Sequence, residues 1–275
     1  MRCFACGSTA DGAAGAHGPG IPAVPLPGLR QAAQRISAGV LNRTQYPSDV
    51  IALVVLWRLR YRLTLRDLAE MFLIRGIVFS YEAVREWEAK LTPILSDELR
   101  QRRRHRPLAP SWYVDETYVK VKGRWCYLYR AIDRNGALVD VMLSERRNLA
   151  AAKAFFRSAK AATGTVPDRV TSDGHDAYPQ AIHTELGKAV THRTNVYLNN
   201  RLEQDHRGIK GRIRCMRGFG SFVSAGRFCR GHDELRNFLR VRAFHRQYVS
   251  ADRRRRDCLR SGGRAVIAAC GRGRA

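Results

Sequence analysis

The chain has 275 residues, which suffices for one large domain or for a catalytic domain with a small accessory module. Its 49 lysines and arginines outnumber 24 aspartates and glutamates, and the formal charge of +25 favours nucleic acid over a neutral substrate as partner. The longest apolar run, residues 50–57, is too short to cross a bilayer, and no signal-peptide pattern opens the sequence. We therefore expect a cytoplasmic protein without a membrane partner.

The first 44 residues are rich in glycine, alanine and proline and show no apolar periodicity. This composition predicts disorder or an extension outside the folded domains. Cys3 and Cys6 have the two-residue gap of zinc sites, but no second pair or nearby histidine couple completes the four ligands that structural zinc requires. Reduced, unpaired thiols are therefore the expectation there.

Residues 45–99 have helical spacing of apolar positions. Thr64 and Ser80 are suited to cap two consecutive helices, and Gly76 marks the turn between them. This pattern predicts a small all-α, helix-turn-helix-like module, although an ordinary helical bundle has the same periodicity. The second helix carries several glutamates, which would repel phosphates and make sequence-specific reading by that helix doubtful.

Residues 100–110 contain an arginine run and are interpreted as a basic linker or hinge. Residues 111–248 then alternate between strand and helix patterns, with tight turns at Gly123 and at Asn135-Gly136. Three consecutive strands followed by strand-helix units predict an α/β domain with a mixed sheet flanked by helices. Residues 249–275 are polar, glycine-rich and arginine-rich, and we expect a disordered tail.

Three carboxylates stand where catalytic groups gather. Asp115 lies among bulky apolar residues of the first strand, Asp173 ends a later strand, and Glu203 lies early in a helix. At about 4 Å and an effective dielectric constant near 20, each like-charged pair costs about 4 kcal/mol, so such a cluster must protonate or bind cations. Oxygen ligands suit Mg²⁺ or Mn²⁺, and two such ions catalyse phosphodiester chemistry. Aspartates at strand ends are otherwise commonly caps or surface ion pairs.

Four motifs resemble the DDE transposases of bacterial insertion sequences, most closely the insertion-sequence-six family, across about residues 46–246. The motifs are YRLTLRDLAEM at residues 61–71, WYVDETYVKVKGRW at 112–125 with YLYR at 127–130, SDGHDAY at 172–178, and NRLEQDH at 200–206 with RGF at 217–219.

The resemblance implies an RNase H-like fold with a five-stranded sheet, and a DNA strand cleavage and transfer activity that uses Asp115, Asp173 and Glu203 to bind two Mg²⁺ or Mn²⁺ ions. The implied partners are the terminal inverted repeats of the element, target DNA and further copies of the chain on DNA. A bacterial, nucleoid-associated location follows.

Basic residues around the motifs are expected to contact DNA. Lys210 stands seven residues after Glu203, on the same helical face, where the family places a basic residue that could hold a DNA phosphate. A solvated lysine on an exposed face is the alternative for Lys210. The other expected DNA contacts are Arg212, Arg214, Lys120 and Lys122.

Glu116 and Asp205 are adjacent acids that point away from their motif neighbours, so we expect both outside the metal shell. His206, one turn from Glu203, is the histidine placed to neighbour the site. The 29 residues between Asp173 and Glu203 are fewer than is usual in the family. Two alternatives therefore stand: a related RNase H-like nuclease or integrase, and a catalytically inactive DNA-binding relic.

Overall fold

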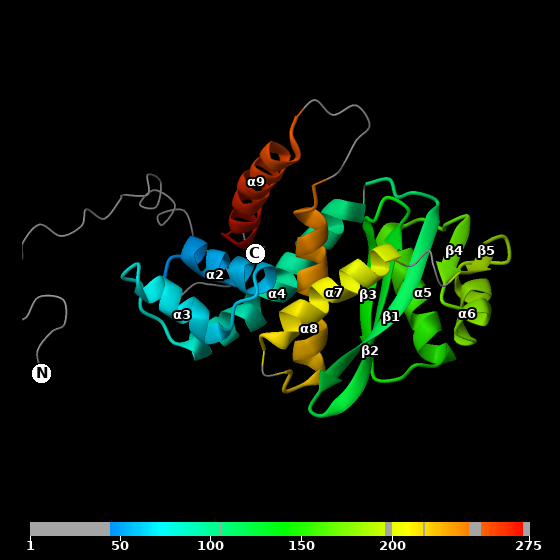
Figure 1. Ribbon diagram of the computed structural model, residues 1–275, viewed down its shortest axis with the longest axis horizontal. Helices are drawn as coiled ribbons and strands as arrows, with labels where there is room; N and C mark the ends of the chain where they lie inside the picture. Colours follow the sequence, from blue (N-terminus) through cyan, green and yellow to red (C-terminus); the bar gives the residue numbers. More distant parts are fainter. Residues whose placement is uncertain (1–44, 105, 196–199, 217, 242–248, 272–275) are drawn as a thin grey trace, which may run out of the picture. The chain divides into compact units, whose positions relative to one another are not determined.

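The computed structural model describes residues 45–104, 106–195, 200–216, 218–241 and 249–271 (Figure 1). The expectations for residues 1–44 and for the last four residues of the tail lie outside these described ranges. No helix in the described ranges has both the length and the apolar character that a membrane crossing requires.

The described residues that precede the sheet form three helices. They are α2 (Ser48–Arg60), α3 (Leu65–Leu73) and α4 (Tyr81–Arg104). Thr64 caps α3 as expected: its hydroxyl accepts from the backbone N–H of Asp67, and the Asp67 carboxylate accepts from the backbone N–H of Thr64. The predicted helical module is present.

Five strands form one mixed sheet in the order β3-β2-β1-β4-β5 (Figure 1). The first three are antiparallel neighbours joined by tight turns, whereas β4 and β5 run parallel to β1. This order and these directions are those of the RNase H-like fold, so the predicted fold class is confirmed. The strands are β1 (Ser111–Val121), β2 (Arg124–Asp133), β3 (Leu138–Ser144), β4 (Arg169–Ser172) and β5 (Thr191–Thr194).

Helices cover the sheet and divide its side chains between two cores. Alternation along β1 places Trp112 and Val114 in the core formed with α5 and α6, and Val119 and Val121 in the core shared with α4 and α8. The remaining helices are α5 (Leu149–Thr163), α6 (Ala177–Glu185), α7 (Asn200–Arg214), α8 (Phe222–Phe238) and α9 (Ala251–Gly271).

The predicted basic linker is not a hinge. Its first residues belong to α4, and Arg103 is buried, with its guanidinium donating to both carboxylate oxygens of Glu234 in α8 at 2.8 and 2.9 Å. Arg100 pairs with Asp140 of β3 at 3.2 Å. Both arginines thus form ion pairs with acids of the sheet and of α8. In addition, one hydrophobic core includes residues of α2, α4 and α8. The helical module is therefore continuous with the sheet domain.

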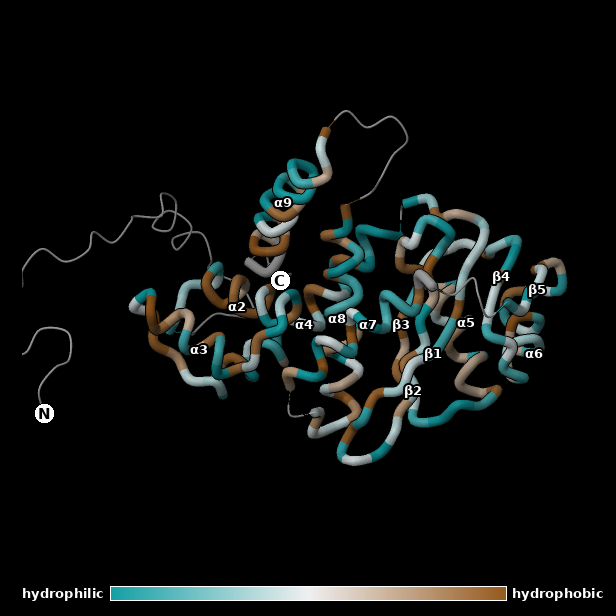
Figure 2. Tube along the Cα trace, viewed as in Figure 1, coloured by the Kyte–Doolittle hydropathy of each residue, from teal (hydrophilic) through white to brown (hydrophobic). Residues whose placement is uncertain are grey.

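The predicted disordered tail is also corrected over most of its length, because residues 251–271 form α9. The arginine run conceals an apolar stripe: Leu259, Val266 and Ile267 pack against the core, and Val266 is 1% exposed. Figure 2 shows hydrophilic and hydrophobic segments alternating along this helix. The apolar stripe lets α9 pack on α2 and α4.

Candidate active site

Two of the three expected carboxylates meet because of the strand register. The parallel pairing of β1 with β4 aligns Tyr113 with Thr171, so two residues further along Asp115 of β1 comes level with Asp173, directly after β4. Gly174 follows with a φ of 94°, a backbone conformation that glycine adopts readily and that turns the chain away from the site. Oxygens of Asp115, Asp173 and Glu116 all lie within 4.8 Å of one another.

The environment of Asp115 disfavours its charged form. Burial, followed by the charges of Glu116 and Asp173, raises the pKa of Asp115 to about 7. A hydrogen bond at 2.9 Å, which the Glu116 backbone N–H donates to Oδ1, and the nearby Arg147 guanidinium act in the opposite direction without cancelling these effects. The cluster thus carries more negative charge than the surrounding protein neutralises.

Arg147 and Tyr178 form hydrogen bonds with the carboxylate of Glu116. The Arg147 Nε–H donates to one oxygen of Glu116 and the Tyr178 hydroxyl donates to the other. Arg147 also donates to Oδ2 of Asp173 at 3.3 Å. Burial, followed by the Glu116 charge, raises the pKa of Tyr178 well above its usual value. Glu116 is therefore a fixed neighbour of the two aspartates, and both of its carboxylate oxygens accept hydrogen bonds from the protein.

Glu203 lies outside this group of carboxylates. Its side chain is 54% exposed, and Arg207, one turn further along α7, lies 3.8 Å away. His206 instead contacts the site, with Nδ1 3.7 Å from Oδ2 of Asp115. Burial, with the charges of Arg130 and Lys210, lowers the pKa of His206 to about 3, so the imidazole is neutral near pH 7. The expected histidine neighbour is present, and it contacts β1 from α7.

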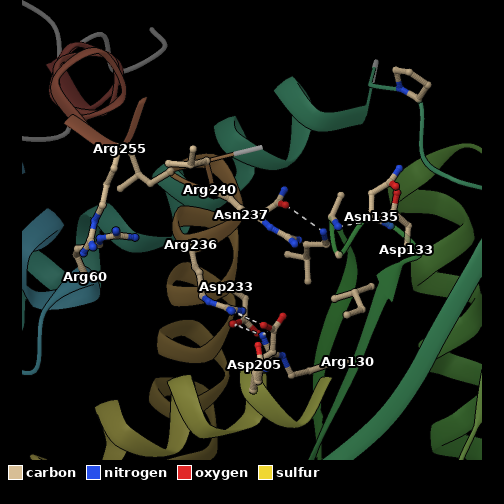
Figure 3. Close-up of a pocket in the computed structure, with 18 residues that line it drawn as sticks. Arg60, Arg130, Asp133, Asn135, Asp205, Asp233, Arg236, Asn237, Arg240 and Arg255 are labelled. Carbon is tan, nitrogen blue, oxygen red and sulfur yellow. Dashed lines mark hydrogen bonds and ion pairs between the residues drawn. The ribbon is translucent and has the colours of Figure 1, made fainter. Parts of the chain in front are cut away.

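Ion pairs join α7 to α8 and lie next to β2 (Figure 3). Asp205 pairs with Arg236 of α8 and lies 3.8 Å from Arg130 of β2, which in turn donates to Asp233 at 2.8 Å. These four side chains line a cavity of about 820 Å³. Asp205 is thus held by arginines outside the carboxylate group, as expected, and it sets the position of the helix that carries Glu203.

Four of the five expected DNA-binding residues are exposed. Lys210 and Arg214 lie on α7, and Lys120 and Lys122 lie at the end of the β1–β2 hairpin. No carboxylate in the described ranges forms an ion pair with any of the four. They remain available to a polyanion.

Arg212 is different, because its side chain points into the core and the residue is only 3% exposed. Its guanidinium donates to the backbone carbonyl of Arg58 and lies 5.7 Å from the centroid of the Phe228 ring. Burial, followed by the charge of Arg58, lowers the pKa of Arg212 to about 10. The structure does not place Arg212 where DNA could reach it.

Comparisons with known proteins agree with this architecture. A family model described as a DDE domain matches residues 109–242. The transposase for insertion sequence-like element IS431mec of Staphylococcus aureus (strain Mu50) is 37% identical over 172 residues, which cover 61% of this chain and 75% of the relative. The transposase for element IS257 in transposon Tn4003 of Staphylococcus aureus shows the same identity and coverage.

Solved structures with partial similarity include the HTLV-2 integrase catalytic core domain in complex with magnesium, at 15% identity, covering 50% of this chain and 91% of that chain with a TM-score of 0.37. The catalytic domain of Mos1 mariner transposase matches at 12% identity, covering 64% of this chain and 93% of that chain with a TM-score of 0.31.

The strand order and the matched DDE domain define the class of protein, a transposase that cuts and transfers DNA. The match to this chain covers 75% of the length of each of the two Staphylococcus aureus transposases. The chain belongs to the insertion-sequence-six family of DDE transposases.

Proposed function

We propose that the chain cleaves the ends of its own insertion sequence and joins the freed 3′ hydroxyl to target DNA, with Asp115, Asp173 and Glu203 holding two divalent cations. The observation that carries the proposal is the pairing of Asp115 with Asp173 across parallel strands, with a charge that the protein leaves uncompensated. Terminal inverted repeats and target DNA are the proposed DNA partners, bound by an assembly of several copies of the chain.

The donor set fits Mg²⁺ or Mn²⁺. All its ligand atoms are carboxylate oxygens, and the raised pKa of Asp115 expresses a deficit of positive charge that a cation would remove. Bound there, two divalent cations would supply activation of the attacking oxygen and stabilisation of the leaving oxygen at phosphorus. Arg147 supplies one positive charge next to Glu116 and Asp173. Among the described residues, Asp115 forms no ion pair with a lysine or arginine, and the His206 imidazole that it contacts is neutral near pH 7.

Glu203 is proposed as the third ligand because its helix already contacts β1. His206, three residues after Glu203 and hence on the same helical side, touches Asp115, so the site lies one turn from the glutamate. The exposed Lys210 and Arg214, further along α7, are proposed to hold DNA phosphates beside the cut. Glu116 keeps its contacts to Arg147 and Tyr178 and positions Asp173 through Arg147.

A strand-transfer assay with element-end DNA and Mg²⁺ tests the proposal. Loss of a group that merely supports a metal ligand typically costs 10- to 100-fold, so Asp115→Asn and Asp173→Asn should each reduce product by more than about a hundredfold. Glu145→Gln is a matched control, because Glu145 is an exposed acid beside β3 that contacts none of the carboxylates. Equal product from parent, Asp115→Asn and Asp173→Asn would refute the proposal.

The exposed position of Glu203 favours a second candidate, an inactive relic that binds DNA without assembling the metal site. Calorimetric titration with Mn²⁺ separates the two, with Glu203→Gln and Glu116→Gln as the compared variants. Weaker Mn²⁺ binding in Glu203→Gln than in Glu116→Gln supports Glu203 as the ligand. The reverse order assigns that place to Glu116, and no Mn²⁺ binding by the parent supports the relic.

A further inference from the structure

A groove of about 620 Å³ runs between the end of the β1–β2 hairpin and α7. In Figure 1 this hairpin extends beyond the other strands of the sheet. One wall carries aromatic rings and the other carries cations. We call it the aromatic groove, and its defining residues are Tyr118, Trp125, Tyr127, Lys120, Lys210 and Arg214.

The aromatic wall is built by strand register and remains open to solvent. Pairing of Tyr118 with Tyr127, and of Lys120 with Trp125, places all four side chains on one face of the hairpin. Tyr118 is 49% exposed and Trp125 is 60% exposed. Their ring centroids lie 6.2 Å apart at 81°, and the Tyr118 and Tyr127 centroids lie 5.4 Å apart. The rings support one another, yet two of them present large surfaces that the described protein leaves uncovered.

The charges in the groove indicate which kind of ligand would bind against these rings. Lys120 lies 5.7 Å from the centroid of the Trp125 ring, and Lys210 and Arg214 face the aromatic wall from α7. No described carboxylate pairs with these three cations. A second copy of the chain, with its charge of +25, would meet repulsion here. An occupant with both flat apolar faces and regularly spaced negative charges satisfies both walls, and an unpaired stretch of nucleic acid has this chemistry.

The groove and the carboxylate cluster share the strand β1. Glu116 lies two residues before Tyr118 on the same strand face, and its carboxylate accepts from Arg147, which also donates to Asp173. On the other wall, Lys210 follows Glu203 by two helical turns. A strand lying in the groove therefore leads directly to the proposed metal site.

We propose that the aromatic groove binds unpaired nucleotides of the DNA strand adjacent to the cut, with a base stacked on Trp125 and Tyr118 and the phosphates on Lys210 and Arg214. The proposal deepens the function proposed above and rests on it for the identity of the strand. Stacking requires a base that has left the duplex, so the groove distinguishes single-stranded from fully paired DNA.

The test measures binding of a twelve-residue oligothymidylate to the full chain in a chelator, where no strand is cut. Base-aromatic stacking predicts that Trp125→Leu weakens this binding about tenfold, whereas Trp125→Phe, which keeps a stacking ring, stays near the parent. A twelve-residue abasic oligomer carries the phosphates without the bases, and Trp125→Leu should leave its affinity unchanged. Tyr61→Ala, at an aromatic residue that is 47% exposed at the end of α2, is the matched control and should behave as the parent.

Unchanged oligothymidylate binding in Trp125→Leu would overturn the proposal, and so would equal losses for the abasic oligomer. A change in the association state of Trp125→Leu without a change in oligothymidylate binding would identify the groove as an interface between copies and would also overturn it. The readout is independent of catalysis, because binding is measured in a chelator, where no strand is cut. Failure of strand transfer and failure of the groove are thereby distinguished.

Discussion

The substitution Asp115→Asn is expected to stabilise the protein while it abolishes the proposed activity. The pKa of Asp115 is about 7 in the folded protein against an ordinary value of 3.8, a rise of about three units. At about 1.4 kcal/mol per unit, ionised Asp115 lowers the free energy of unfolding by about 4 kcal/mol. Asparagine keeps the size of the side chain and an oxygen that can accept from the Glu116 backbone N–H, but it carries no charge.

The sign of the effect sets its pH dependence. Because the folded-state pKa is raised, the cost of Asp115 is absent below about pH 4, grows between pH 4 and 7, and is complete above pH 7. Urea unfolding in a chelator, followed by tryptophan fluorescence, should therefore give the same midpoint for parent and Asp115→Asn at pH 4. At pH 8 the variant should have the higher midpoint by about 2 M, for a denaturant slope of about 2 kcal/mol/M.

Glu145→Gln provides the comparison, since removal of an exposed carboxylate changes stability by less than about 0.5 kcal/mol at either pH. If Asp115→Asn is no more stable than the parent at pH 8, or if its advantage is the same at pH 4, the carboxylate cluster does not carry the excess charge that we derive. Mg²⁺ at pH 8 should stabilise the parent more than the variant, because the cation removes the same repulsion.

Two further predictions concern the contact between α4 and α8. Arg103→Met leaves the buried Glu234 without its partner and should lower the free energy of unfolding, measured in urea, by about 3–5 kcal/mol. Arg103→Met combined with Glu234→Met should recover most of this loss, and no recovery would contradict the pairing. Gly231→Ala places a Cβ 2.3 Å from Cγ2 of Thr92 and should lower the free energy of unfolding, measured in urea, by about 1–3 kcal/mol. Gly226→Ala, in the same helix but with no atom closer than 4.0 Å to the new Cβ, should raise the free energy of unfolding by up to about 1 kcal/mol. Equal effects of the two substitutions would exclude the close approach as the cause.

Local patterns were sufficient to predict the sheet. Gly123 and Gly136, at which the sequence predicted tight turns between the first three strands, adopt φ of 80° and 76°. Glycine permits this backbone conformation more readily than other residues do. Asp173 was predictable because the end of β4 is visible in the sequence and ligand-binding groups gather at strand ends. Asp115 lies inside β1, and the resemblance of its motif singled it out.

Helix boundaries that depend on packing were not predictable in this way. Pro93 lies inside α4, and the helix continues through it. Ser221 caps α8, which begins at Phe222, by accepting from the Ser224 backbone N–H at 3.1 Å. Gly226 and Gly231 weaken the helical pattern there, and burial of α8 against α4 outweighs their low propensity.

Side-chain partners remote in sequence account for the remaining differences. Glu116 joins the aspartates through Arg147 and Tyr178, which lie 31 and 62 residues away, and no pattern within one strand contains that information. Arg212 resembles its exposed neighbour Arg214 in sequence, but its guanidinium donates in the core to the carbonyls of Arg58 and Leu59, which lie 154 and 153 residues away.

The continuity of α4 has a geometric consequence. This single helix of 24 residues begins in the helical module and ends beside the sheet, and at 1.5 Å per residue it is about 36 Å long. That is about the length of one turn of B-form DNA. The ion pair of Arg103 with Glu234 joins the far end of α4 to α8, so the helix fixes the distance between the parts of the protein at its two ends. The helical module and the sheet are therefore held at a separation that the protein itself sets and that no linker motion changes.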